Sequence, residues 1–245
     1  MPRFFVQTSA ICADTVTIVG SDASHISRSL RMKVGDTLTV CDMQRTEYTC
    51  KIESITPDSV TASILSKTES QNEPPYCATL FMALPKGDKM EYIIQKAVEM
   101  GVWRIVPYRS ERSVVKLDAA SGAKKAQRWQ KIADSAAEQC GRGILPEVLP
   151  PVDFHTALSM AKEHELSFVC YEDEQSLTLP ALLKGQARVP TSVSFFVGAE
   201  GGIAKGEIEA FRHAGLACVG LGKRILRCES APLFVLSCLS YHWEI

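Results

Sequence analysis

The amino-acid sequence predicts two domains, a small β-rich domain followed by a larger α/β domain. Up to residue 68, the chain consists of short segments typical of β-strands. Residues 68–75 are polar and end in two prolines, which is typical of a linker. From Tyr76 onward, apolar strand-like runs alternate with helical patterns, which predicts a parallel sheet covered by helices on both faces. We therefore expect the domains at residues 1–70 and 76–245.

The strands of the first domain are expected at Arg3–Gln7, Val16–Val19, Thr37–Asp42, Thr46–Ser54 and Ser59–Lys67. A single helix is expected from Ala23 to Arg31, with Ser21 or Asp22 as its N-cap. Many short strands and one helix predict a small β-barrel.

In the second domain, the expected strands are Cys77–Ala83, Trp103–Pro107, Leu166–Tyr171, Val193–Val197 and Ala217–Leu221. The expected helices are Asp88–Met100, Ala123–Cys140, Phe154–Glu163, Lys205–Ala214 and Pro232–Trp243. The helix from Asp88 shows the reasoning, because its apolar residues recur at the spacing of one helix face. These residues are Met90, Ile93, Ile94, Ala97 and Val98. Gly101 then marks its end.

Composition excludes several classes of protein. Hydrophobic residues make up 46% of the 245 residues and charged residues 22%, which is typical of a globular protein. No apolar run approaches the roughly 20 residues of a membrane helix, and the first residues lack the apolar core of a signal peptide. We therefore expect a cytoplasmic protein without a membrane partner.

The nine cysteines are dispersed, odd in number and without CxxC spacing, and the five histidines show no metal-binding motif. The sequence therefore predicts neither a disulfide framework nor a metal site. The net charge of −1 does not indicate a nucleic-acid partner, so any basic surface must be local.

Two segments that each follow an expected strand stand out. Gly198-Ala199-Glu200-Gly201-Gly202 lies where open α/β sheets bind ligands, although a tight turn explains the glycines equally well. Leu221–Ala231 is unusually basic for a loop beside a buried strand, with Lys223, Arg224 and Arg227 close together. An anionic partner or a solvated loop explains these cations. A stripe of Lys124, Arg128 and Lys131 on one helix is likewise either a solvated face or a phosphate-binding ridge. Ser230 is the expected N-cap of the last helix.

These two loops resemble the signature loops of the RsmE family, SPOUT-class methyltransferases that act on 16S ribosomal RNA. The resemblance continues in order along the chain. It includes Arg3-Phe4-Phe5, His25 with Leu30-Arg31, Lys86-Gly87-Asp88-Lys89-Met90, Gln95-Lys96-Ala97, Arg112-Ser113-Val114-Val115 and Glu138-Gln139-Cys140-Gly141-Arg142. Two departures are mild: Ala199 stands where the family usually has proline, and Ser230 where it usually has threonine.

The resemblance implies a PUA-like RNA-binding β-barrel at 1–70 and a SPOUT α/β domain with a deep trefoil knot at 76–245. It implies a homodimer that uses S-adenosylmethionine to methylate N3 of a uridine in the decoding region of 16S ribosomal RNA. The RNA partner is either small-subunit ribosomal RNA or the assembled small subunit.

Residue chemistry then suggests roles for individual side chains. Arg227 and Arg224 are the candidates to stabilise negative charge on the base. Glu200 either accepts the proton of N3 or caps the following helix. The cofactor-binding candidates are Cys170, Gly198, Glu200, Gly201, Gly202, Leu221, Gly222, Ile225 and Leu226. The RNA-binding candidates are Arg3, Arg28, Arg31, Lys86, Lys89, Arg109 and Arg112.

Three alternatives remain open from the sequence. One is an α/β enzyme that uses a nucleotide cofactor on a small metabolite, although this leaves the β-rich domain unexplained. Another is a ribosome-associated RNA-binding protein without enzymatic activity. The third is a methyltransferase that modifies the ribose 2′-oxygen instead of the base.

Overall fold

The computed structural model describes residues 1–115 and 117–245. The chain forms two compact units, which are treated separately below. The first unit comprises Met1–Glu73 and Ala137–Leu145, and the second comprises Pro74–Ala136 and Pro146–Ile245. The segment Ala137–Leu145 therefore groups with the first unit, although it falls inside the range 76–245 assigned to the second domain from the sequence.

The first unit contains a six-stranded mixed sheet that forms a half-barrel. Its strands are β1 (Arg3–Phe5), β2 (Ile11–Cys12), β3 (Thr15–Val19), β4 (Thr37–Cys41), β5 (Thr46–Ile55) and β6 (Ser59–Glu69). The spatial order is β1-β4-β5-β6-β3-β2, in which β1 and β4 are parallel and all other pairs are antiparallel. Alternate side chains such as Ile18, Leu38 and Ile52 are buried in one core, as the period-two pattern predicts.

The helical part of the first unit differs from the single helix expected over Ala23–Arg31. A 3₁₀ turn, η1 (Thr8–Ala10), precedes β2, and a four-residue α1 (Ser21–Ser24) continues into the π-helical turn η2 (His25–Ser29). The residue at the N-cap is Gly20, not Ser21 or Asp22. The helix ends before Arg31, whose positive φ of 52° is incompatible with a right-handed helix.

A buried ion pair joins the two segments of the first unit. Arg142 donates from Nε and Nη2 to the carboxylate of Glu73, at 2.9 and 2.7 Å, and both side chains are almost fully buried. The backbone N–H of Gly143 donates to the same carboxylate at 2.8 Å. Arg3 donates to the carbonyl oxygen of Arg142 and to Glu47. These contacts hold residues 137–145 against residues 1–73 within the first unit.

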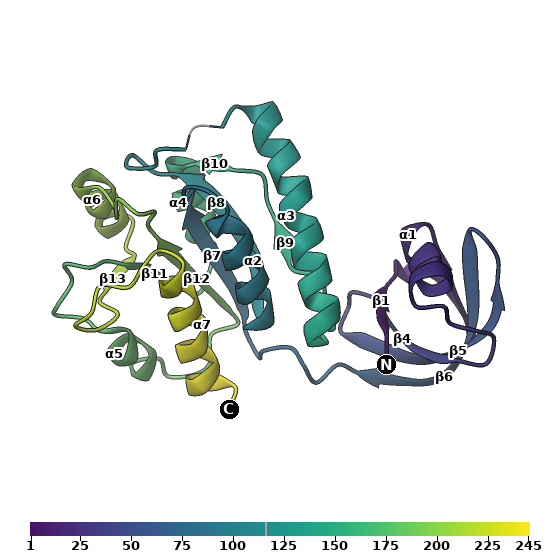
Figure 1. Ribbon diagram of the computed structural model, residues 1–245. Coiled ribbons are helices and arrows are strands. Elements are labelled where there is room, and N and C mark those ends of the chain that lie inside the picture. Colours follow the sequence, from purple (N-terminus) through teal and green to yellow (C-terminus); the bar gives the residue numbers. More distant parts are fainter. Residues whose placement is uncertain (116) are drawn as a thin grey trace. The chain divides into compact units, whose positions relative to one another are not determined.

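The second unit is built on a parallel sheet, shown in Figure 1. Its strands are β7 (Cys77–Ala83), β8 (Val102–Arg109), β9 (Glu147–Val148), β10 (Val152–Asp153), β11 (Leu166–Cys170), β12 (Ser192–Val197) and β13 (Ala217–Val219). The order is β10-β8-β7-β12-β11-β13, with β9 also paired to β8, and every pair is parallel. The central strands β7 and β12 are buried at every residue after the first, as expected of strands covered on both faces.

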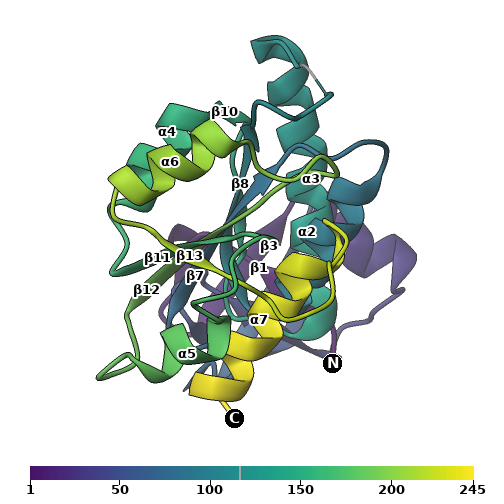
Figure 2. The ribbon, with the colours of Figure 1, turned by 90° about the vertical axis from the view of Figure 1, so that its left-hand side faces the viewer.

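The helices of the second unit cover both faces of this sheet (Figure 2). They are α2 (Lys89–Glu99), α3 (Ala119–Cys140, whose last turn from Ala137 belongs to the first unit), α4 (Phe154–Ala161), α5 (Leu179–Lys184), α6 (Lys205–His213) and α7 (Ser230–Trp243). On one face, α4 and α6 enclose an aromatic core that includes Phe81, Phe196 and Phe211. On the other, α2 packs against α7.

The apolar stripe predicted for α2 is confirmed, because Met90, Ile93, Ile94, Ala97 and Val98 are all buried. Ser230 is not the N-cap of α7, since Glu229 occupies that position and Ser230 is the first helical residue. Among the described residues, no helix is long and apolar enough to cross a membrane.

Candidate functional site

Four neighbouring strands of the second unit, β7, β12, β11 and β13, end at one edge of the sheet. Because they are parallel, the segments that follow their carboxyl ends gather at that edge. These segments are 84–88 after β7, 198–204 after β12, 171–178 after β11 and 220–229 after β13. Residues far apart in the sequence are thereby brought together.

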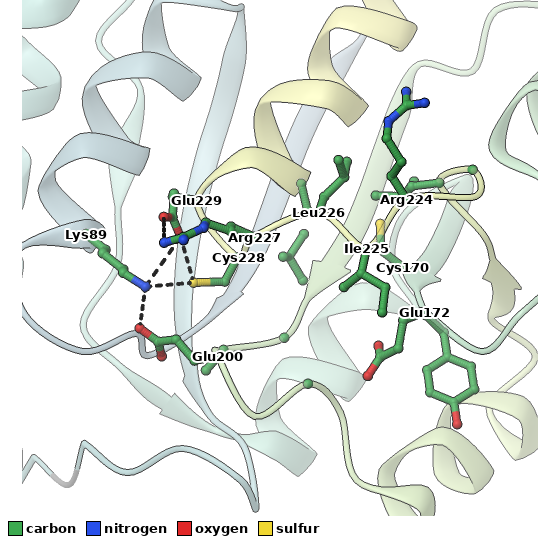
Figure 3. Close-up of a pocket in the computed structure, with 18 of the residues that line it drawn as sticks. Lys89, Cys170, Glu172, Glu200, Arg224, Ile225, Leu226, Arg227, Cys228 and Glu229 are labelled. Atoms are coloured by element: carbon green, nitrogen blue, oxygen red, sulfur yellow. Dashed lines mark hydrogen bonds and ion pairs between the residues drawn. The ribbon is translucent and has the colours of Figure 1, made fainter.

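A cavity of about 370 Å³ lies at this edge, between the two loops singled out from the sequence (Figure 3). Most of the predicted cofactor-binding residues line it, and so do Arg224 and Arg227. The lining members of that set are Cys170, Gly198, Glu200, Gly202, Leu221, Gly222, Ile225 and Leu226. Gly201 instead faces Arg112, whose Nη1 donates to the Gly201 carbonyl oxygen at 2.9 Å.

The loop after β12 folds tightly on itself, and its glycines make this possible. A Cβ on Gly198 would lie 2.9 Å from the backbone carbon of Gly202, and Gly202 has a positive φ of 68°. Ala199 and Gly202 also form an isolated β-bridge. Both glycines are therefore required by the backbone of a loop that lines the cavity.

The cavity lining also includes Glu172, which sequence reasoning missed, and Lys223, which it noted only as one of the cations of the second loop. Glu172 is the second residue after β11, and Figure 3 shows its carboxylate on the side of the cavity opposite Glu200. The strand end Val169-Cys170-Tyr171 was expected from the sequence to line the site, and this expectation stopped one residue short of Glu172, whose only signal was its place just past a strand end.

Lys89 lies inside this site as well, although the sequence suggested an RNA contact. Its Nζ is 2.9 Å from Oε1 of Glu200 and 3.5 Å from Oε2 of Glu229. Burial alone would raise the pKa of Glu200, but hydrogen bonds from Lys89 and from the backbone N–H of Lys86 outweigh it and lower that pKa below its usual value. The hydrogen bond to Glu200 raises the pKa of Lys89. The carboxylate and ammonium are therefore both charged at neutral pH.

Cys228 also borders this group of charges. Its thiol donates to Oε2 of Glu229 at 3.2 Å, and burial raises its pKa to about 12. The thiol is thus protonated at neutral pH and is a poor nucleophile.

The expectation that Glu200 caps the next helix is wrong. Helix α6 begins after Ala204, and the side chain of Glu207 accepts a hydrogen bond from the Ala204 N–H at 3.1 Å. The carboxylate of Glu200 instead accepts hydrogen bonds from the backbone N–H of Lys86 and from Nζ of Lys89.

The six residues other than Lys89 that were predicted to bind RNA fall into three groups. Lys86, Arg109 and Arg112 are exposed and lie at the carboxyl edge, close along the chain to the ends of β7 and β8. Arg28 and Arg31 are exposed in the first unit. The side chain of Arg3 is 13% exposed and donates to Glu47 and to Cys41 Sγ, so it presents little of its charge to solvent.

Within residues 1–115 and 117–245, no group of three or more His, Cys, Asp or Glu side chains is arranged to hold a metal ion. The site instead presents backbone loops, apolar side chains and charges of both signs.

Comparison with protein families gives two matches. Residues 72–240 match the family described as RNA methyltransferase domain, and residues 19–65 match the RNA methyltransferase PUA domain. The first match covers most of the second unit, including both loops of the cavity.

Individual proteins match over the full length of the chain. Ribosomal RNA small subunit methyltransferase E of Bacillus subtilis is 35% identical, with 100% of this chain and 98% of that protein covered. The crystal structure of the Neisseria gonorrhoeae protein of the same name, bound to S-adenosyl methionine, has a TM-score of 0.86 at 32% identity and covers 99% of this chain and 98% of that one. A putative methyltransferase from Legionella pneumophila with bound cofactor SAM has a TM-score of 0.85 at 31% identity, with 98% and 96% covered.

Proposed function

The chain belongs to the ribosomal RNA small subunit methyltransferase E family, and we propose that it transfers a methyl group from S-adenosylmethionine to N3 of a uridine in the decoding region of 16S ribosomal RNA. The observation that carries this proposal is the cavity between residues 198–202 and 221–229, with Arg224, Arg227 and Glu200 around it.

The residues of this cavity fit the cofactor. Its glycine backbone is open to close approach by a nucleoside, and Leu221 and Leu226 provide apolar walls. The carboxylate of Glu172 in the lining suits a ligand with cationic groups. Bound there, S-adenosylmethionine supplies an electrophilic methyl group for an in-line displacement, in which positioning contributes much of the rate.

We assign the remaining chemistry to the chain's own side chains. Glu200 accepts the proton of N3, and the guanidinium groups of Arg227 and Arg224 stabilise the negative charge that develops on the uracil ring. The target base must leave its stack to reach the cavity, which costs a few kcal/mol. Lys86, Arg109 and Arg112 surround the same edge and would contact the flanking phosphates.

The decisive experiment combines methyl transfer with analysis of the product. The substrates are small ribosomal subunits, and the free 16S RNA extracted from them, from cells that lack the gene. After reaction and digestion to nucleosides, mass spectrometry should find one new methyl group on a uracil base. A methyl group on the ribose would replace this proposal by 2′-oxygen methylation. Absence of transfer to both substrates would favour a non-enzymatic RNA-binding protein.

Binding to small-subunit RNA should weaken steeply with salt. If about four phosphates are contacted, raising the salt from about 100 to about 200 mM should reduce affinity about tenfold, because each contact releases condensed counterions. Filter binding across a salt series measures the slope. A flat response would show that the exposed arginines and lysines do not contact the phosphate backbone.

We further propose that the protein acts as a homodimer in the cytoplasm. In support, α2 and α7 pack together and carry exposed apolar side chains at Tyr92, Phe234 and Tyr241. From the family resemblance, we also propose that the domain at residues 76–245 contains a deep trefoil knot. Sedimentation velocity should give twice the chain mass of 26.9 kDa, and a monomer would refute the dimer.

A further inference from the structure

Lys89 occupies a central position among the charges of the site. It is the first residue of α2, Glu200 lies in the loop between β12 and α6, and Glu229 directly precedes α7. Figure 3 shows the ammonium group between the two carboxylates, with contacts to Glu200 and Glu229 and to Cys228 Sγ at 3.9 Å. The Lys89 side chain thus contacts two other segments, each more than a hundred residues further along the chain.

The position of Lys89 differs from that of a surface cation. Only 34% of its side chain is exposed, and its Nζ points toward the cavity instead of away from the protein. The carboxylate of Glu200 is held from a second direction by the backbone N–H of Lys86, at 3.2 and 3.4 Å. Two donors therefore fix both the orientation and the charge of this one carboxylate.

From this geometry we infer that Lys89 is a positioning residue for methyl transfer, which holds Glu200 ionised and oriented at the edge of the cavity to accept the N3 proton. The inference rests on the proposed function. In the reaction, the N3–H bond breaks and its proton passes to Glu200. The electron pair of that bond forms the new nitrogen–carbon bond, and the pair of the broken sulfur–carbon bond stays on sulfur.

Removing the ammonium group would leave Glu200 and Glu229 without the cation that both carboxylates contact. Like charges at short range disfavour ionisation, and so does burial, which already acts to raise the pKa of both carboxyls. Other charges around the cavity modulate this effect but do not replace Lys89. Arg227 lies 4.0 Å from Glu229, and Arg112 binds the carbonyl oxygen of Gly201. The remaining ionisable groups of the lining are Tyr171, Glu172, Lys223, Arg224 and the protonated thiols of Cys170 and Cys228.

The first test measures the carboxyl group itself, without cofactor or RNA. Carboxyl ¹³C resonances of labelled glutamate are titrated in the wild type and in Lys89→Met, and the signal of Glu200 is identified by its loss in Glu200→Gln. We expect the pKa of Glu200 to rise by about one to two units in Lys89→Met. In Lys89→Arg, the pKa of Glu200 should stay low. In the double variant Lys89→Met with Glu229→Gln, the pKa of Glu200 should return part of the way toward its wild-type value. An unchanged pKa in Lys89→Met would overturn the inference.

The second test asks whether this ionisation matters for the reaction. Single-turnover rates are measured from about pH 5 to about pH 8, and the rate of Lys89→Met is divided by the wild-type rate at each pH. This ratio cancels any pH dependence that both proteins share. We expect the ratio to fall about tenfold or more toward the acidic end, as Glu200 becomes protonated in the variant. A role in folding alone would lower the ratio equally at every pH, and that result would refute the inference.

Lys96→Met serves as the matched control, because Lys96 lies on the same helix and pairs with Glu99. It should leave both the titration and the rate ratio unchanged. Failure of the wild type to methylate RNA would refute the proposed function, whereas the titration would still decide whether Lys89 sets the ionisation of Glu200.

Discussion

Replacing Gly198 with valine should abolish S-adenosylmethionine binding. A Cβ at this position would lie 2.9 Å from the backbone carbon and 3.1 Å from the carbonyl oxygen of Gly202, and 3.0 Å from Cγ1 of Ile203. The obstacle is backbone, so it cannot move aside as a flexible side chain would. The loop must open, and Gly202 and Glu200 then leave their places in the cavity lining. Isothermal titration calorimetry should show affinity reduced about 100-fold or more, since about 2.7 kcal/mol of lost contacts suffices.

The series Gly198→Ala, Gly198→Val should show increasing loss, because valine adds two methyl groups to the Cβ that already clashes. Gly206→Ala is the matched control. It lies in the first turn of α6, where a Cβ meets nothing within 4 Å, and alanine is the better helix former. Its affinity should stay within about twofold of the wild type. Wild-type affinity in Gly198→Val would mean that the loop does not bind the cofactor.

Replacing Arg227 with methionine should slow methyl transfer about 100-fold and leave S-adenosylmethionine affinity almost unchanged. Loss of one preorganised group that stabilises developing charge has an effect of this size in other enzymes. The side chain of Arg227 is 82% exposed at the cavity and lies 4.0 Å from Glu229, so it is available to an incoming base. Because the charge it would stabilise exists only during the reaction, the rate should change and cofactor affinity should not.

The measurement is a single-turnover rate at saturating cofactor and RNA, with cofactor affinity determined separately. Arg227→Lys should lie in between, because it keeps the charge but loses the planar fork of donors. Arg188→Met is the control. Arg188 lies before the amino end of β12, whereas the cavity loop follows the carboxyl end of this strand, and Arg188 pairs with Glu165. A rate close to wild type in Arg227→Met would assign charge stabilisation to another group, and Arg224→Met would then be the variant to measure.

The sequence predicted the longer elements of this protein well. Every helix and strand with a strong apolar period was placed within a few residues, because burial of one face is encoded directly in the spacing of residues such as Met90 and Ile93. Short elements such as β9, β10 and α5 were missed. The strands β9 and β10 have two residues each, which is too short for a periodic pattern. The six-residue helix α5 is indicated in the sequence only by Thr178 as its N-cap and Pro180 in its first turn.

The site was predicted through its loops but not through its side-chain partners. Residues 198–202 and 221–231 were expected to meet, and the structure brings them to one cavity. The pairing of Lys89 with Glu200 could not be read from the sequence, because it depends on β7 and β12 being neighbours in the sheet. The first paired residues of these two strands, Cys77 and Ser192, are 115 residues apart in the chain. Local pattern does not encode which strands become neighbours in a parallel sheet.

The buried pair of Glu73 and Arg142 has a consequence for dividing the protein. The chain passes between the two units three times, after Glu73, after Ala136 and after Leu145. A fragment cut at the apparent linker would keep the carboxylate of Glu73 and lose the guanidinium that neutralises it in the interior. An isolated, uncompensated carboxylate there is strongly unfavourable. The first unit therefore cannot be excised as residues 1–73 alone, because it needs residues 137–145, which lie within the sequence of the second domain, to complete its own interior.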